Sequence, residues 1–201
     1  MTVEIRNPAN PDEVVGTFPT LKSEDVPSVV EIARKAQREW AKVPQPERGR
    51  LVDGFLDGLQ ARTEDIARSI TREMGKIIGE SRGEVNKALG EGRATTRRAS
   101  APIGEVLPSQ KPGTVTYSTR RPRGVIVGIN PWNFPFSTPI RKTIPALVYG
   151  NAIVLKPSIS TPGAAFIMQE VADATLPKGI FQIANGSGSL GTALTSAAGV
   201  D

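Results

Sequence analysis

Three short apolar runs in the second half of the chain restrict its fold more than any other feature. The runs are GVIVGI (124–129), AIVLKPS (152–158) and IFQIAN (180–185), and segments with helical spacing separate them. Thr138-Pro139 and Thr161-Pro162 are expected to begin these helices, with threonine as N-cap and proline as first helical residue. Near-continuous apolar runs of this length are typical of parallel strands that are covered on both faces. Two successive strand–helix–strand units predict a parallel sheet with right-handed crossovers, and therefore an α/β fold.

The first hundred residues predict two short strands followed by helices. Val3–Ile5 and Val14–Phe18 are strand-like and flank the turn-rich stretch NPANPDE. Apolar residues at three- and four-residue spacing then predict four helices, which begin near Ser23 and Pro46 and cover 64–74 and 78–99. Gly75 is expected to end the third helix.

The second predicted helix contains two glycines, Gly54 and Gly58. Glycine inside a helix costs roughly 1 kcal/mol relative to alanine. Each glycine therefore either weakens the helix or allows a neighbouring element to pack closely, and the sequence leaves both explanations open.

Residues 102–123 have the pattern of a β-hairpin. GEVLPS and TVTYSTRR are strand-like, and QKPG between them is a turn signal. An isolated hairpin is only marginally stable in water, so we expect this one to dock on the rest of the chain or on another subunit.

Composition excludes several kinds of chemistry. The chain has no cysteine and no histidine, which rules out disulfides, thiolate or imidazole metal sites, a cysteine nucleophile and a Ser-His-Asp triad within it. No apolar run approaches the roughly 18 residues that cross a bilayer, and the N-terminus lacks the apolar core of a signal peptide. We therefore expect a cytoplasmic protein without a membrane partner.

The chain is basic, with a net charge of +5. Its clustered arginines are Arg97, Arg98, Arg120, Arg121 and Arg123. A nucleic-acid-binding surface also needs aromatic side chains or a reading helix beside the basic patch, and few aromatic residues lie near these arginines. We interpret the arginines as a solvated face or a subunit contact, and expect no nucleic-acid partner.

Polar residues follow the first two apolar runs, where ligands bind in open α/β sheets. Lys156 lies at the end of the second run and is either a ligand for ribose hydroxyls or phosphate, or a solvated lysine. Asn133 follows the first run, and its amide either donates a hydrogen bond to a developing oxyanion or fills a turn between prolines.

The segment 186–191, GSGSLG, fits G-x-G-x-x-G between a predicted strand and a predicted helix. Such glycines allow a pyrophosphate to approach the backbone at a helix N-terminus. The segment belongs to the third strand rather than the first, and no acidic residue follows about 20 positions later within the chain. A flexible turn is the alternative explanation.

The longer segment IVGINPWNFPFSTPIRKTIPALVYGNAIVLKPS resembles the aldehyde dehydrogenase superfamily. It contains, in order, the family's P-W-N-aromatic-P turn, a helix ending in P-A-L-x-x-G-N and a strand ending in K-P-S. ITREMGK and LPKGIFQIANGSGSLG are also similar to family elements. The resemblance implies an incomplete coenzyme domain, made of an N-terminal helical part over 1–101 and a partial Rossmann-like part over 124–201, with a protruding oligomerisation-arm hairpin over 102–123.

The resemblance also implies functional roles. Asn133 would be the amide of the oxyanion hole, which stabilises the thiohemiacetal that forms when a cysteine attacks an aldehyde. The remaining residues would contact NAD or NADP. Asn130 and Trp132 would lie on its nicotinamide side, Lys156 and Ser158 at the adenosine ribose or a 2′-phosphate, and Gly188 near the adenosine end.

The chain departs from the family pattern in two respects. Ile159 stands where a glutamate often selects NAD, so the resemblance leaves NAD and NADP open. The nucleophilic cysteine and general-base glutamate of the family would follow residue 201. We therefore expect the N-terminal part of a semialdehyde-dehydrogenase-like enzyme, inactive alone, whose full length acts on an aldehyde and forms homo-oligomers through 102–123. The alternative is a non-catalytic nucleotide-binding or interaction module.

Overall fold

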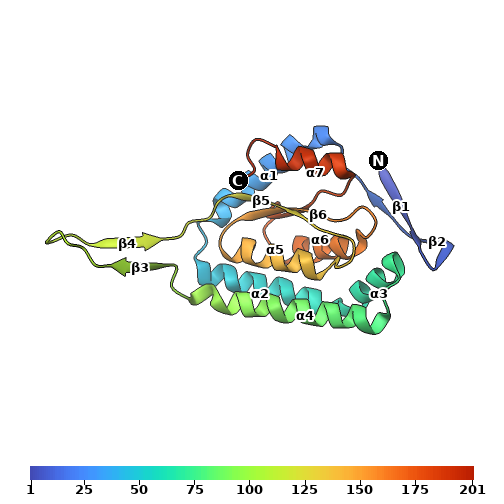
Figure 1. Ribbon diagram of the computed structural model, residues 1–201, viewed down its shortest axis with the longest axis horizontal. Helices are drawn as coiled ribbons and strands as arrows, with labels where there is room; N and C mark the ends of the chain where they lie inside the picture. The colour runs from blue at the N-terminus through green and yellow to red at the C-terminus, as the bar shows by residue number, and fades with distance from the viewer.

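A three-stranded parallel sheet forms the centre of the computed structural model, which describes residues 1–201 (Figure 1). The strands β5 (Val125–Ile129), β6 (Ala152–Lys156) and β7 (Phe181–Ile183) lie in that order. Val125 pairs with Ala152 and Ile129 with Lys156, so the carboxyl ends of β5 and β6 are level. The predicted α/β fold with a parallel sheet is confirmed.

Helices cover both faces of the sheet (Figure 1). On one face lie α1 (Val26–Trp40), after a short 3-10 turn at Ser23–Asp25, and α7 (Gly188–Thr195). On the other lie the crossover helices α5 (Ser137–Val148) and α6 (Gly163–Thr175). Outside them is a further layer of α2 (Gln45–Ala61), α3 (Thr63–Met74) and α4 (Ile78–Thr96), the last of which continues into a 3-10 turn at Arg97–Ser100. None of these helices is long and apolar enough to cross a membrane.

The crossover helices begin without the local caps that the sequence predicts. The sequence predicts Thr138 as the N-cap and Pro139 as the first residue of α5, but α5 begins two residues earlier, at Ser137. There the Glu84 carboxylate accepts hydrogen bonds from the backbone N–H groups of Phe136 (3.1 Å) and Ser137 (3.0 Å). Similarly, α6 begins at Gly163, whose N–H donates to the Glu73 carboxylate at 2.9 Å. Carboxylates of the outer layer therefore satisfy the first amides of both helices.

The C-terminal end of α5 is capped by side chains from α1 and α2. The Trp40 indole N–H donates to the carbonyl of Leu147 at 2.8 Å, and the Arg48 guanidinium donates to the carbonyl of Val148 at 3.0 Å. Both side chains are buried. The Leu147 carbonyl also accepts the N–H of Gly150 at 3.0 Å, and the two side chains attach the end of α5 to α1 and to α2 of the outer layer.

The two glycines of α2 have different surroundings. A Cβ added at Gly58 would lie 2.5 Å from Cγ1 of Val171 on α6, whereas one added at Gly54 would meet nothing within 4 Å. Gly58 therefore permits the close packing of α2 on α6, and Gly54 only weakens the helix. Gly75 ends α3 with a φ of 78°, as the sequence predicts.

A hairpin lies at each end of the body (Figure 1). The strands β1 (Thr2–Asn7) and β2 (Asn10–Pro19) pair beside α3, where Glu13 forms an ion pair with Arg72. The second hairpin, β3 (Gly104–Leu107) and β4 (Thr116–Thr119), projects from the opposite end. We call residues 102–123 the arm.

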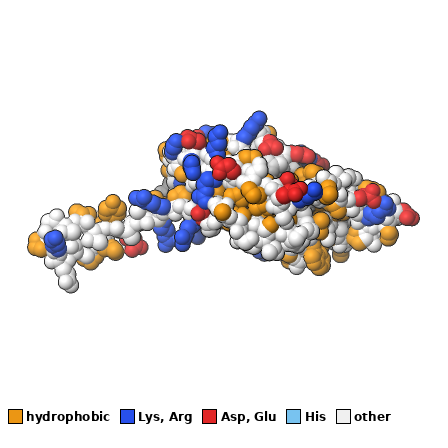
Figure 2. Space-filling view, turned by 90° about the horizontal axis from the view of Figure 1, so that it is seen from above, with side chains coloured by type: hydrophobic (Ala, Val, Ile, Leu, Met, Phe, Trp, Pro, Cys, Tyr) orange, Lys and Arg blue, Asp and Glu red, His pale blue; other side chains and the backbone are white.

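The arm docks on no other part of this chain, so the first of its two predicted docking partners is wrong. Every residue from 102 to 121 is exposed, including Val106 (79%), Val115 (76%) and Tyr117 (69%). Figure 2 shows hydrophobic side chains on the projecting arm and basic side chains where it joins the body. An apolar hairpin in water is a surface that another protein could cover.

We expect the two glycines of α2 to respond oppositely to alanine. Gly58→Ala forces a methyl group against Val171 and is expected to lower the free energy of unfolding by about 1–3 kcal/mol. Gly54→Ala, the matched control in the same helix, is expected to raise it by up to about 1 kcal/mol. Urea unfolding followed by circular dichroism measures both, and equal effects would contradict the close packing of α2 on α6.

Candidate active site

The carboxyl edge of the sheet brings several predicted site residues together. Asn130 directly follows β5, and its backbone N–H donates to the carbonyl of Lys156 at 3.0 Å. The Lys156 side chain extends towards α7, where its Cδ and Cε would lie 3.5 Å from a Cβ added at Gly191. Ser158 is half-buried just beyond Lys156. Asn130, Lys156 and the first turn of α7 therefore line one edge, which is the edge that the topology predicts for Lys156.

Lys156 is buried rather than solvated, with 6% of its surface exposed. Burial lowers the pKa of its ammonium group. Its Nζ donates to the carbonyl of Pro157 at 3.3 Å, and no carboxylate pairs with it. A buried cation without an acidic partner favours an anionic or hydroxyl-rich ligand that supplies the missing interactions.

Two buried acceptors at the same edge lack a hydrogen-bond partner. They are the Oδ1 atoms of Asn130 and Asn185, whose amide nitrogens donate to the carbonyls of Gly128 and Pro19, each at 2.9 Å. Buried polar atoms of folded proteins are almost always satisfied, so such atoms need an explanation. Together with Lys156 they make this edge polar and incompletely bonded, which fits a dinucleotide site.

The first two glycines of the segment 186–191 have different surroundings, since Gly186 is tightly packed and Gly188 faces open space. A Cβ at Gly186 would lie 2.9 Å from the carbonyl oxygen of Leu21, so this glycine allows the chain to pass close to its neighbour. Gly188, the first residue of α7, is exposed, and a Cβ there would meet nothing within 4 Å. The free first turn of α7 can accept an approaching phosphate.

The loop between β5 and α5 presents Trp132, Asn133 and Phe134 to solvent. Trp132 is 57% exposed and Phe134 is 48% exposed. The backbone beneath them is fixed. Lys76 Nζ donates to the carbonyl of Asn133 at 2.9 Å, and the Thr161 hydroxyl donates to the carbonyl of Trp132 at 3.4 Å. The Asn133 side chain is therefore free to bind a ligand while its main chain is held.

The supporting residues Glu73, Lys76 and Glu84 were not identified from the sequence. The segment ITREMGK (70–76) resembles a family element, but the resemblance assigns no role to Glu73 or Lys76. Glu84 lies on the same buried face of α4 as Ser81, Val85 and Ala88. A carboxylate within an otherwise small and apolar face is the signal that could have revealed it.

Glu73 is the most strongly perturbed carboxylate of the site. Burial raises its pKa to about 8, against the smaller opposing effect of the hydrogen bond from the Gly163 N–H. The carboxyl of Glu73 therefore holds a proton at pH values where exposed glutamates are ionised. The Glu73 carboxyl accepts the N–H of Gly163 at the start of α6, so its protonation state affects the end of the loop between β6 and α6.

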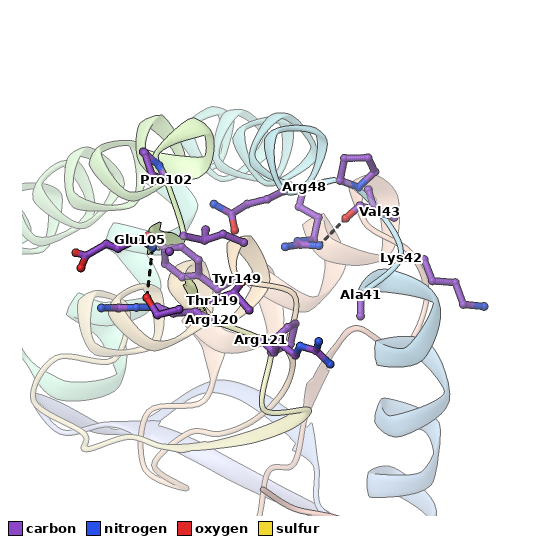
Figure 3. Close-up of a pocket in the computed structure, with 16 residues that line it drawn as sticks. Ala41, Lys42, Val43, Arg48, Pro102, Glu105, Thr119, Arg120, Arg121 and Tyr149 are labelled. Carbon is purple, nitrogen blue, oxygen red and sulfur yellow. Dashed lines mark hydrogen bonds between the residues drawn. The ribbon is translucent and has the colours of Figure 1, made fainter. Parts of the chain in front are cut away.

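A cavity of about 930 Å³ lies elsewhere, between the base of the arm and the body. Figure 3 shows Arg48 and Tyr149 on the body side and Arg120 and Glu105 on the arm side. This cavity is beside the amino end of β5, at the opposite edge of the sheet from Lys156. Since arm residues line it and no predicted site residue does, the cavity is not part of the candidate active site.

Comparison with known proteins identifies the family. The sequence model of the aldehyde dehydrogenase family matches residues 1–201. The chain is 37% identical over 189 residues to alpha-ketoglutaric semialdehyde dehydrogenase of Bacillus subtilis, which covers 94% of this chain and 39% of that protein. It is 34% identical over 197 residues to benzaldehyde dehydrogenase [NAD(+)] of Pseudomonas putida, covering 97% of this chain and 40% of that protein.

A solved structure agrees with this result. The NADP-dependent glyceraldehyde-3-phosphate dehydrogenase of Bacillus halodurans, complexed with NADP, superposes with a TM-score of 0.93 at 33% identity, over 100% of this chain and 44% of that one. The chain belongs to the aldehyde dehydrogenase family, a family of oxidoreductases, and its fold is part of the coenzyme domain of that family. It spans about two-fifths of the length of the curated relatives that it matches.

The buried Glu73 predicts how stability depends on pH. Its pKa rises from 4.5 unfolded to about 8 folded, so its stabilising contribution is complete below pH 4.5 and is lost as the pH rises towards 8. Glu73→Gln cannot ionise. We expect the Tm of the variant, relative to the unmodified chain, to increase by a few degrees from about pH 5 to about pH 8.

Thermal unfolding at the two pH values measures this difference, with Glu80→Gln at an exposed position of α4 as the control. Parallel behaviour of Glu73→Gln and the unmodified chain across this range would show that Glu73 is not protonated in the folded state.

Proposed function

We propose that this chain is the N-terminal portion of an NAD(P)-dependent aldehyde dehydrogenase that oxidises an aldehyde to a carboxylic acid. One observation carries the proposal: in a chain of this family, the PWNFP loop after β5 lies next to the buried Lys156 that ends β6, at the carboxyl edge of a parallel sheet. The two loops are bonded to each other through Thr161.

Asn133 is proposed as the residue of this chain that acts on the reacting carbonyl. In the full-length enzyme a cysteine outside residues 1–201 attacks the aldehyde carbon and gives a thiohemiacetal, whose oxygen gains negative charge. The exposed Asn133 amide donates a hydrogen bond to that oxygen, and its held backbone means that little reorganisation is needed. The turn-filling explanation gives no role to the Asn133 side-chain amide, which is exposed and makes no hydrogen bond, whereas its main chain is held by Lys76.

The remaining predicted residues are proposed to bind the cofactor, which accepts the hydride of the thiohemiacetal when it is bound. Asn130 and Trp132 flank its nicotinamide side, Lys156 and Ser158 contact the adenosine ribose, and Gly188 lies near the adenosine end. The unpaired, buried Lys156 suits a hydroxyl or a phosphate equally. We therefore propose NAD or NADP, since one relative is named for NAD and one neighbouring structure contains NADP.

The substrate and assembly of the full-length enzyme are proposed from its relatives and from the arm. The Bacillus subtilis relative is named for a semialdehyde, so a semialdehyde is the first substrate class to test. The exposed apolar arm is proposed to form a homo-oligomer by covering a neighbouring subunit.

Asn133→Ala in the full-length enzyme is expected to lower kcat for aldehyde oxidation by about 10²–10³-fold, because one oxyanion donor is lost. The dissociation constant of the cofactor should remain within about twofold, since Asn133 contacts the carbonyl only. Asn86→Ala at an exposed position of α4 is the matched control. Unchanged kcat in Asn133→Ala would show that Asn133 is a turn residue.

A second candidate function is a non-catalytic nucleotide-binding module. Two features favour this alternative. The 201-residue chain has its own core of 37 buried hydrophobic residues, and all the residues predicted to bind the cofactor lie within the same chain. The dehydrogenase proposal expects no aldehyde-dependent NAD(P)H formation by the isolated chain, and a cofactor dissociation constant weaker than about 1 mM.

Tryptophan fluorescence decides between the two functions. Trp132 is exposed and Trp40 is 1% exposed, so quenching by NAD or NADP reports mainly on Trp132, and Trp132→Phe is the control. Saturable quenching at micromolar cofactor would favour the nucleotide-binding module. Dehydrogenase turnover by the purified isolated chain would contradict the proposed division of catalytic residues.

A further inference from the structure

An ion pair from the outer helical layer lies directly beneath the loop that carries Asn133. Lys76 follows the left-handed Gly75 at the end of α3, and Glu84 lies in α4. The Lys76 ammonium contacts one carboxylate oxygen of Glu84. Their side chains are 11% and 3% exposed, respectively, so the pair is shielded from water. We call it the clamp.

The clamp bonds the loop on both sides of the Asn133–Phe136 segment. Lys76 Nζ donates to the carbonyl of Asn133 at 2.9 Å and lies 4.4 Å from the centroid of the Phe134 ring. The second oxygen of Glu84 accepts the N–H groups of Phe136 and Ser137. One ion pair therefore fixes the peptide that follows Asn133 and the start of α5 relative to each other.

The clamp is poorly explained as a device for stability alone. Taking two charges out of water costs several kcal/mol per ion, and apolar replacements of similar size are often as stable as a buried pair. The pair instead fixes the orientation of the loop backbone, because its ammonium group binds one carbonyl and its carboxylate binds two amides with charge-assisted hydrogen bonds. The exposed Asn133 side chain, which has no such support itself, takes its position from this backbone.

We propose that Lys76 and Glu84 are positioning residues for the Asn133 amide. The inference rests on the proposed role of Asn133 and extends it to two residues of another layer. The clamp holds the Asn133 peptide so that its side-chain N–H points to the oxygen on which charge develops. A displacement of about 1 Å at such a donor can cost about a hundredfold in rate.

A double-mutant cycle in the full-length enzyme tests the proposal. The variants are Lys76→Met, Asn133→Ala and the double variant, assayed for kcat, aldehyde KM and cofactor dissociation constant. Lys76→Met is expected to lower kcat about 10- to 100-fold and to leave cofactor affinity within about twofold. The double variant should be no slower than Asn133→Ala alone, because Lys76 acts through Asn133.

Conservative and distant substitutions supply the controls. Lys76→Arg keeps the charge and should restore at least a third of the kcat lost in Lys76→Met. Lys42→Met removes a lysine of the exposed pair with Glu39 and should leave kcat unchanged. Additive effects of Lys76→Met and Asn133→Ala, or a loss confined to cofactor affinity, would overturn the positioning role.

The outcomes separate this inference from the proposed function. If Asn133→Ala alone leaves kcat unchanged, the role of Asn133 is wrong and the clamp has no amide to position. If Asn133→Ala lowers kcat but Lys76→Met does not, only the clamp proposal is wrong.

If Lys76→Met fails to fold, Glu84→Met in the 201-residue chain, which removes the acceptor of both amides, replaces it, with hydrogen exchange as the readout. Faster exchange is then expected at the amides of Phe136 and Ser137, with the interior of α4 unchanged. Unchanged exchange at these two amides would overturn the proposal.

Discussion

The arrangement of the site depends on the opposite charges that hold the two ends of α5. The Glu84 carboxylate accepts the first amides of this helix, and the Arg48 guanidinium donates to a carbonyl at its last turn. Each charge has the sign that the helix dipole favours at that end. Since α5 connects β5 to β6, fixing it along its axis also fixes the loop that precedes it and the strand that follows it.

The outer helical layer therefore does more than cover a hydrophobic face. Glu73 holds the start of α6, Glu84 holds the start of α5, and Lys76 holds the loop between β5 and α5. Buried charges are costly, and the two charges of this group, Lys76 and Glu84, are each paired with backbone groups of the loop and of α5. Glu73 is different, because burial raises its pKa to about 8 and its carboxyl stays neutral at lower pH. All three side chains lie beside the loops that carry Asn133 and Lys156, the residues to which we assign roles in the proposed function.

The sequence predicts the elements of this fold better than it predicts how they are joined. Apolar periodicity locates β5, β6 and the helices to within a few residues, and Gly75 marks its helix end, because these signals are local. Caps that come from residues 52, 53 and 90 positions away have no local signal, which explains why Thr138 and Thr161 were favoured as helix starts over Ser137 and Gly163. Of the site, topology predicts that Lys156 and the loop of Asn133 lie at the carboxyl edge of the sheet, which the structure confirms, whereas the clamp is visible only in the tertiary structure.

We propose that the chain supplies one wall of an aldehyde dehydrogenase active site, in which the Asn133 amide donates a hydrogen bond to the reacting carbonyl oxygen. A structure of the full-length enzyme, trapped as its covalent aldehyde adduct, tests this claim most directly. We expect the Asn133 Nδ2 to lie about 3 Å from the adduct oxygen, with Lys76 still bonded to the Asn133 carbonyl. An adduct oxygen bonded only to other donors, with the Asn133 amide turned away from it, would show that Asn133 is not the oxyanion donor.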